Sequence, residues 1–227
     1  MTRAEVRGGS VFVEVAGVRN FRDAGGAGAL PRGVLYRSGA LDGLLPAGAR
    51  RLAELGVRTV VDLRSTPEVR DRPDDCRGLP VDHCHLPVFT EQRWPAEQAE
   101  LYPAMAEQAG PATVALVRRL AAPGAGPVLV HCASGKDRTG VVVAVVQTLL
   151  GATEQEVTGD FLRSNAALGL TAGTADTAAG HRTLPVAAGH LRRALVWMRS
   201  HHGSVEGWLL ANGAKEDDLS ALRTALG

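Results

Sequence analysis

The chain has 227 residues, of which 45% are hydrophobic and 22% are charged, and its formal net charge is +1. This balance is typical of a globular protein and excludes the strongly basic surface that a nucleic-acid partner requires. The longest apolar run, at 141–150, is interrupted by Gln147 and Thr148 and is far too short to span a bilayer. We therefore expect no stable membrane insertion, and the length predicts one α/β domain over residues 1–227.

Cysteine use and the first residues predict the compartment. Residues 1–15 contain four charged side chains and no continuous apolar segment, unlike a cleaved signal peptide. The cysteines are three, Cys76, Cys84 and Cys132, and an odd number argues against a disulfide framework. A reducing cytoplasm is the expected location. Export without a signal peptide stays open, as does the oligomeric state.

In the first part of the chain, apolar runs and turn residues predict a β-rich half. The expected elements are an edge strand at 11–15, a glycine-rich loop at 18–31, a short strand at 34–37, a helix at 47–55 and a central strand at 57–63. The central strand ends at Asp62, so its end is expected at the edge of the sheet where ligands bind in open α/β folds.

The second part reads as mainly helical. The expected elements are a strand at 81–86, a helix at 111–120, a strand at 127–130, a helix at 141–150, a helix begun by a capping box at 153–156, a mobile segment at 166–180, a helix at 186–202, and two short helices at 204–226 broken at 212–213. Residues 153–227 would thus form a helical C-terminal part.

The segment His-Cys-Ala-Ser-Gly-Lys-Asp-Arg-Thr-Gly, at 131–140, is the most informative in the chain. It joins the strand at 127–130 to the helix that follows. The N-terminus of a helix presents free N–H groups and partial positive charge, and successive loop amides form an anion-binding nest. The sequence therefore predicts an oxyanion site in this loop.

A phosphate in this loop gives each side chain a role. Cations and a helix N-terminus lower the pKa of a thiol, so Cys132 is a candidate thiolate nucleophile that attacks phosphorus. Arg138 offers the planar, two-pronged donor that phosphate oxygens need. The backbone of Ala133, Ser134, Gly135, Lys136, Asp137 and Arg138 would cradle the remaining oxygens.

Two flanking residues have alternative roles. Thr139 either hydrogen-bonds the sulfur, orients the hydrolytic water, or only caps the helix. His131 either supports the loop and tunes the thiolate or is a structural histidine at a strand end. A nucleotide-binding P-loop is excluded by spacing, because Val130 stands where glycine is required and Asp137 where serine or threonine is required.

The loop resembles the signature of cysteine-dependent phosphatases, and its fuller form resembles the bacterial tyrosine and lipid phosphatases of the protein-tyrosine phosphatase B type. Supporting segments share the family's motifs: Asn-Phe-Arg-Asp-Ala-Gly-Gly at 20–26, Leu-Tyr-Arg-Ser-Gly-Ala at 35–40, Asp-Leu-Arg-Ser at 62–65 with Glu68, Phe-Leu-Arg-Ser-Asn at 161–165, and the helix at 203–209. The resemblance implies an α/β fold with a central, mainly parallel sheet and helices on both faces. Members of the family resembled here carry a long two-helix lid, and the shorter stretch at about 90–110 implies a one-helix or reduced lid in this chain.

The resemblance also implies an activity. It implies hydrolysis of phosphate monoesters, on phosphotyrosine and also on phosphoserine, phosphothreonine and phosphoinositides, without a metal or other cofactor. The expected partners are thus a phosphorylated protein or a phosphoinositide, with no nucleic acid. Lys136 adds positive charge to the loop, which favours multiply charged substrates.

The general acid is the least determined residue. The leaving oxygen needs a proton within hydrogen-bonding reach, and better-known tyrosine phosphatases supply it from an aspartate on a separate mobile loop. The comparable stretch at 85–91 contains no aspartate. Asp137 is the first candidate, Asp62 the second and Glu91 the third. Asp62 has a structural alternative as the partner of Arg64.

Other polar residues have two interpretations each. Arg22 and Asp23 lie either beside the site or in a surface turn, and residues 163–165 either contact the catalytic loop or are solvated. His83, Cys84 and His85 alternate along a strand, so one metal ion cannot reach all three. Cys84 is either a buried strand residue or a partner thiol that traps oxidised Cys132.

Two other functions remain open from the sequence. One is a sulfurtransferase of the rhodanese type, which also carries a cysteine in an anion-binding loop. The other is a non-catalytic module that binds phosphorylated ligands. Arg138, Thr139 and the upstream motifs argue against the sulfurtransferase, and the presence of both Cys132 and Arg138 argues against a pure binding module.

Overall fold

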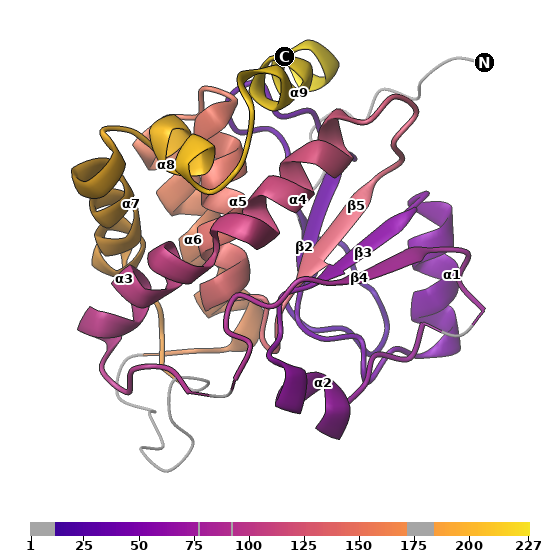
Figure 1. The fold of residues 1–227 in the computed structure, drawn as a ribbon. Coiled ribbons are helices and arrows are strands. Elements are labelled where there is room, and N and C mark those ends of the chain that lie inside the picture. Colours follow the sequence, from indigo (N-terminus) through magenta and orange to yellow (C-terminus); the bar gives the residue numbers. More distant parts are fainter. Residues whose placement is uncertain (1–11, 77, 92, 172–183) are drawn as a thin grey trace.

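The structure is a computed structural model that describes residues 12–76, 78–91, 93–171 and 184–227 (Figure 1). Its strands form a five-stranded mixed sheet in the order β1-β2-β5-β3-β4. The strands are β1 (Arg22–Asp23), β2 (Leu35–Ser38), β3 (Thr59–Asp62), β4 (Asp82–His85) and β5 (Val128–His131). Only β1 is antiparallel to its neighbour.

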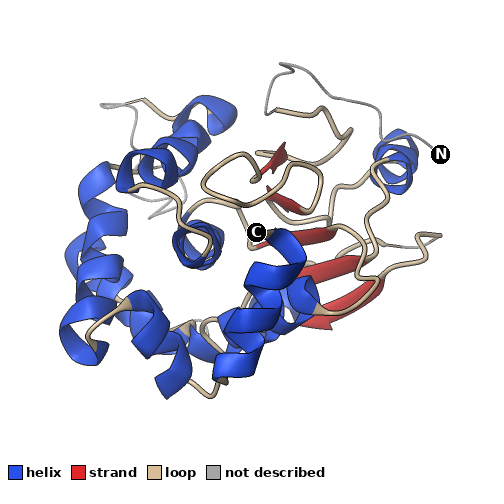
Figure 2. Ribbon diagram, turned by 90° about the horizontal axis from the view of Figure 1, so that it is seen from above, coloured by secondary structure: helices blue, strands red, loops and turns tan. Residues whose placement is uncertain are grey.

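The helices lie on both faces of this sheet, most of them on one side, as Figure 2 shows from above. They are α1 (Pro46–Glu54), α2 (Thr66–Asp71), α3 (Gln98–Gln108), α4 (Gly110–Ala121), α5 (Asp137–Leu149), α6 (Glu154–Leu168), α7 (Ala188–His202), α8 (Val205–Ala211) and α9 (Glu216–Leu226). The predicted fold class, a mainly parallel sheet flanked by helices, is confirmed.

Alternation along the strands divides the core in two. Val61 and Val130 point into the larger cluster, which α3 to α9 cover. Val60 and Leu129 point the other way, into the smaller cluster with Leu52 of α1. The central strands are apolar on both faces because both faces are covered, as expected for parallel strands.

Most of the predicted elements are confirmed within a few residues, and the edge strand is the main error. The segment predicted as a strand at 11–15 forms only an isolated bridge from Phe12 to Arg22, and residue 11 lies outside the described residues. The partner of that bridge is β1, within the segment predicted as a loop. Local alternation identified an extended segment, but a ladder also needs a partner of matching length.

Two helices differ from their predictions in ways that affect the site. Helix α5 begins at Asp137, so the last charged residues of the loop form its first turn. Helix α3, in the segment predicted as a reduced lid, buries Leu101, Tyr102 and Met105 and packs against α7. Of the segment predicted to be mobile at 166–180, α6 includes residues up to Leu168, and residues 172–180 lie outside the described part.

Across the described ranges, no helix combines the length and the apolar character that crossing a bilayer requires.

Candidate active site

The loop that follows β5 lies at the carboxyl edge of the sheet. Residue pairing places His131, the last residue of β5, between Ser38 of β2 and Asp62 of β3. Cys132 follows directly, with 3% of its surface exposed, and α5 begins five residues later. The central strand and the helix thus fix both ends of the loop, and the nucleophile candidate lies at its base.

Two side chains from distant segments donate hydrogen bonds to the carbonyl groups of the loop. The Asn20 amide donates to the carbonyls of Ser134 and Gly135 at 3.0 and 2.9 Å. The Arg37 guanidinium donates to the carbonyls of Gly135 and Lys136 at 3.0 and 3.4 Å. In a trans peptide the N–H points opposite to the C=O, so the amides that follow these carbonyls point away from Asn20 and Arg37.

Three amides of the loop have no acceptor among the described residues, and that of Gly135 is also one of those that point away from Asn20 and Arg37. In the described part of the chain, the N–H groups of Ala133, Ser134 and Gly135 find no acceptor. Gly135 has a φ of +64°, and a Cβ there would lie 2.1 Å from the Ser38 carbonyl oxygen. Only glycine fits this position. This backbone conformation fits the oxyanion nest, which stays a prediction.

A buried network of charges supports Asn20 and Arg37. The Asp160 carboxylate on α6 accepts from Arg22 Nε at 2.9 Å and from Arg37 Nη1 at 2.6 Å. Arg22 also donates to the Asn20 side chain at 2.5 Å and to Ser164 at 3.1 Å. One carboxylate thus positions both arginines behind the loop, and Arg22 acts on the loop only through its neighbours.

Burial and charge shift the pKa values in this network. Burial and the nearby charge of Arg37 lower the pKa of Arg22 to about 9, against the opposing effect of Asp160. Burial alone would raise the pKa of Asp160, but the charges of Arg37 and Arg22 lower it. Asp160 therefore remains ionised between two cations.

The contacts of Asp23 lie within the glycine-rich loop and not beside the phosphate loop. Its carboxylate accepts from the backbone N–H of Gly25 at 2.7 Å and of Gly33 at 2.8 Å. It therefore ties the glycine-rich loop together, which is the surface-turn alternative.

Arg138 is oriented by a carboxylate from α2. Its two terminal nitrogens donate to the two oxygens of Glu68 at 2.5 and 2.9 Å. Burial alone would raise the pKa of Glu68, but the hydrogen bond and charge of Arg138 lower it from 4.5 to about 2. Since a guanidinium has five N–H donors, three remain for phosphate oxygens.

Replacing Glu68 by glutamine should lower kcat/KM toward a phosphotyrosine peptide by about 10²-fold, because Arg138 loses its charged, two-pronged partner. Steady-state kinetics with the peptide measure this. Glu68 also completes the capping box of α2 with Ser65, so Ser65→Ala is the matched control: it removes the capping hydroxyl and leaves Arg138 paired. An equal loss in both variants would assign the effect to the cap.

Trp94 lies against Arg138. The centre of its ring is 5.3 Å from Arg138 Cζ, and it contacts Phe89 with ring centres 5.8 Å apart. The side chain belongs to the segment predicted as a reduced lid. It contacts the guanidinium through a cation–π interaction.

Asp137 is held by a tyrosine. The Tyr102 hydroxyl donates to Asp137 Oδ1 at 2.5 Å, and Lys136 Nζ lies 3.6 Å from Oδ2. Lys136 is itself buried and donates to the Leu184 carbonyl at 2.6 Å. Asp137 retains 18% side-chain exposure, which makes it a half-buried carboxylate at the mouth of the loop.

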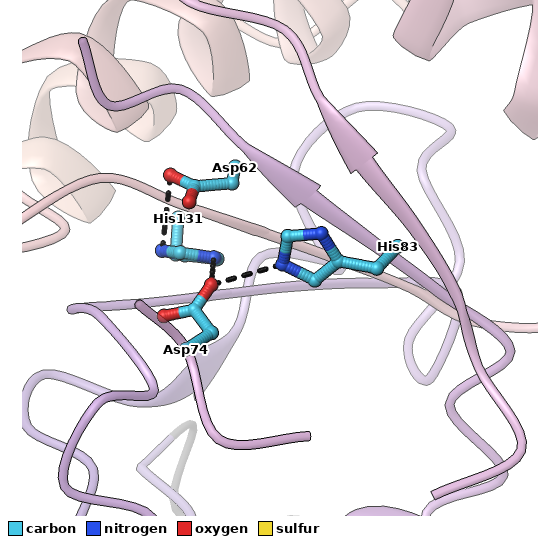
Figure 3. A group of neighbouring side chains, drawn as sticks. All are labelled: Asp62, Asp74, His83 and His131. Carbon is cyan, nitrogen blue, oxygen red and sulfur yellow. Dashed lines mark hydrogen bonds and ion pairs between the residues drawn. The ribbon is translucent and has the colours of Figure 1, made fainter. Parts of the chain in front are cut away.

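Behind the loop lies a cluster of histidines and carboxylates, drawn in Figure 3. His131 Nε2 lies 3.0 Å from Asp74, and its Nδ1 lies 3.3 Å from the Cys132 carbonyl and 3.8 Å from Asp62. Both ring nitrogens thus face oxygens, and these contacts fix the orientation of the ring next to Cys132.

The same cluster offers ligand types for a metal ion: Asp62, Asp74, His83 and His131. A cation already occupies it, because Arg64 contacts Asp62 at 2.6 Å and Asp74 at 2.9 Å. Hydrogen bonds from His131 and His83 lower the pKa of Asp74 far below its usual range, against the effect of burial. These contacts describe a closed hydrogen-bonded cluster supporting His131.

The other candidate acids lie in unfavourable places. Asp62 is fully buried and paired with Arg64, which is its structural alternative. Glu91 is exposed in the loop before α3. Of the three carboxylates, Asp137 is the one within the phosphate loop.

Thr139 and Cys84 differ from part of their predicted roles. Thr139 lies inside α5, whose N-cap is Lys136, so Thr139 is not the cap; its hydroxyl is buried and unpaired in the described structure.

Cys84 is half-buried on the edge strand β4, two strands from β5. Two strand spacings are about 10 Å, beyond the roughly 7 Å between Cα atoms that a disulfide with Cys132 allows.

The residues at the end of α6 do not touch the phosphate loop directly. Ser164 accepts from Arg22, Asn165 pairs with the backbone of Val186, and Arg163 lies 3.8 Å from Asp160. The motif at 161–165 therefore supports the loop from a distance.

A pocket of about 500 Å³ opens beside the loop. Ala133 and Gly39 form part of its wall, together with Glu68, Arg19 and Arg72. It offers room for the part of a substrate that extends beyond the phosphate.

Comparison with known proteins agrees with this geometry. The chain matches the tyrosine phosphatase family over residues 13–227. The chain belongs to this family. The protein is therefore a phosphatase that acts on phosphorylated substrates. Membership of this family also argues against the sulfurtransferase alternative.

Individual relatives are similar over most of the chain. A tyrosine-protein phosphatase of Nostoc commune is 27% identical over 225 residues, which cover 88% of this chain and 76% of the relative. The triple specificity protein phosphatase PtpB of Mycobacterium tuberculosis is 35% identical over 189 residues, covering 67% and 68%. The crystal structure of P. aeruginosa TpbA is 24% identical with a TM-score of 0.43, covering 82% of this chain and 91% of that one.

Several supporting residues of this phosphatase were not assigned roles from the sequence. Asp160 lies on the buried face of α6 together with Val157, Phe161 and Ser164. A carboxylate at a buried position of a helix indicates that a cation is buried next to it. Asn20 has a φ of +58°, a conformation that asparagine tolerates. No local sequence pattern around Tyr102 indicated its hydrogen bond to Asp137.

Proposed function

We propose that this phosphatase hydrolyses phosphotyrosine through a covalent cysteinyl-phosphate on Cys132. The observation that carries the proposal is the loop itself: its carbonyls accept hydrogen bonds from Asn20 and Arg37, so that the amides that follow them point away from these side chains. Arg138, fixed by Glu68, supplies the charged donors. Phosphoryl transfer depends mainly on such positioning and charge stabilisation.

The reaction proceeds in two balanced steps. The Cys132 thiolate attacks phosphorus as the bond to the tyrosine oxygen breaks, and Asp137 gives its proton to that oxygen. Water then attacks the phosphorus of the cysteinyl-phosphate, its proton passes to Asp137, and the thiolate leaves. Arg138 and the loop amides hold the equatorial oxygens in both steps.

Substrates beyond phosphotyrosine belong to the same proposal. The relative PtpB is named a triple specificity phosphatase, and a pocket of about 500 Å³ lies beside the loop. We include phosphoserine, phosphothreonine and phosphoinositides as substrates, in a reaction that needs no metal ion.

Phosphate release from peptides carrying each phosphoresidue and from phosphoinositides, measured with EDTA present, tests the function. Acid quenching of the reaction with ³²P-labelled phosphotyrosine peptide should trap label that maps to Cys132. Turnover without label on Cys132 would contradict the covalent route. Absence of release from every substrate would contradict the function.

Replacing Asp137 by asparagine tests the acid. For a phosphotyrosine peptide, kcat should fall by about 10² to 10³-fold, because the phenolate leaves without a proton. For p-nitrophenyl phosphate, whose leaving group needs little protonation, the loss should be much smaller. Steady-state kinetics with both substrates give the ratio. A selective loss in Glu91→Gln instead would move the role to Glu91.

A further inference from the structure

Asp137 has unequal surroundings at its two carboxylate oxygens. Oδ1 accepts the hydroxyl of Tyr102 at 2.5 Å. Oδ2 lies 3.6 Å from Lys136 Nζ, beyond direct hydrogen-bonding distance, and the same Nζ donates at 2.6 Å to the Leu184 carbonyl. One oxygen is therefore fixed, and the other is left to carry a proton.

Tyr102 is itself held without freedom to turn. It is fully buried on α3. Its ring meets Phe161 edge-on with centres 6.1 Å apart and stacks on His190 of α7 with centres 5.3 Å apart. Burial, together with the charge and hydrogen bond of Asp137, raises the pKa of Tyr102 well above its ordinary value. The hydroxyl therefore keeps its proton and remains a donor.

We propose that Tyr102 is a positioning residue for the reaction: its hydroxyl fixes Oδ1 of Asp137, so that Oδ2 delivers the proton to the leaving oxygen. The inference rests on the proposed function, in which Asp137 is the general acid. In the first step the Oδ2–H bond breaks as the leaving oxygen gains the proton and its bond to phosphorus breaks. In the second, Oδ2 receives a proton from the attacking water.

Removing this hydrogen bond is also expected to change the pH dependence of the reaction. A donor to a carboxylate stabilises its charged form, so removing the Tyr102 hydroxyl should favour the protonated acid. The other charged or titratable groups near the Asp137 carboxylate are Lys136, Arg138 and His190 of α7, and those near the Tyr102 hydroxyl are Cys132 and Arg37. A Tyr102→Phe exchange leaves all of them in place.

The test is Tyr102→Phe, which keeps the ring and removes only the hydroxyl. The kcat for a phosphotyrosine peptide should fall about 10-fold, while p-nitrophenyl phosphate turnover changes little. The basic limb of kcat/KM against pH should move up by about one pH unit, the size expected for one lost hydrogen bond to a charge. A simple loss of folded enzyme would change neither the ratio of kcat values for the two substrates nor the position of the basic limb of the pH profile.

The matched control is Tyr36→Phe, since Tyr36 is the other tyrosine of the chain and lies buried in the smaller core cluster, stacked on Phe21. In an Asp137→Asn background, Tyr102→Phe should add no further loss. A wild-type substrate ratio and pH profile in Tyr102→Phe would overturn this inference alone. Absence of turnover by the wild type would overturn the proposed function and the inference together.

Discussion

Replacing Cys132 by serine is expected to lower kcat toward phosphotyrosine peptides by at least about 10⁴-fold, since removing the nucleophile of a covalent enzyme has effects of this size or larger. A serine hydroxyl is not ionised near neutral pH, so it is a much weaker nucleophile than a thiolate. A phosphoserine formed at this position would also be hydrolysed less readily than the cysteinyl-phosphate. The amides of the loop and Arg138 stay in place, so substrate binding should persist.

Two measurements separate these effects. Steady-state kinetics give kcat, and calorimetric titration of Cys132→Ser with a phosphotyrosine peptide gives the affinity, which should remain near the KM of the wild type. Cys84→Ser is the control, because Cys84 lies on the edge strand two strands away. Residual turnover within tenfold of the wild type in Cys132→Ser would refute its role as nucleophile.

The sequence predicted the part of the site that short segments encode. The order of β5, loop and α5 follows from an apolar strand, a glycine with positive φ and a helix. Local rules for strands, caps and anion nests apply directly there. For the same reason, the capping box at Thr153 and the two C-terminal helices agree with the prediction.

The contacts that orient the loop join distant segments, and the sequence did not predict them. Asn20 and Gly135 are separated by 115 positions, Arg22 and Asp160 by 138, and Tyr102 and Asp137 by 35. Packing of α3 and α6 against α5 brings these side chains together, and no local pattern encodes which face meets which. Motif resemblance singled out the segments of Asn20, Arg22 and Arg37, but not how they connect.

The helix start shows the same limit on a smaller scale. The apolar run from residue 141 predicted the helix, whereas α5 begins at Asp137. The first turn is polar because its side chains serve the loop: Arg138 pairs with Glu68 and Asp137 with Tyr102. Hydrophobic periodicity therefore finds the buried part of a helix and misses a first turn that faces a ligand.

Replacing Asp160 by asparagine should be the most destabilising of the changes considered, by about 3–5 kcal/mol, because it leaves two buried guanidinium groups without a counter-charge. For a chain of this length that is a fall in Tm of roughly 10 °C. Thermal unfolding followed by circular dichroism measures it. Glu154→Gln, an exposed acid on the same helix, should change Tm by little.

The pH dependence of Asp160→Asn has a defined sign. Burial and Arg37 already hold the pKa of Arg22 down to about 9 with Asp160 present, and losing the carboxylate lowers it further. The unfolded chain then binds more protons than the folded one, so the stability of the variant rises with pH as the folded pKa of Arg22 is approached and passed. A Tm deficit that stays constant from pH 6 to pH 9 would contradict this account.

The same exchange connects stability to catalysis. Arg37 holds the carbonyls of Gly135 and Lys136, and Arg22 holds Asn20, which bonds to the carbonyls of Ser134 and Gly135. Without Asp160 both arginines lose their common anchor, so the loop amides lose their fixed direction. At a temperature where Asp160→Asn is still folded, kcat/KM should therefore fall by about tenfold or more. Wild-type kcat/KM in the folded variant would show that the loop keeps its geometry without the charges behind it.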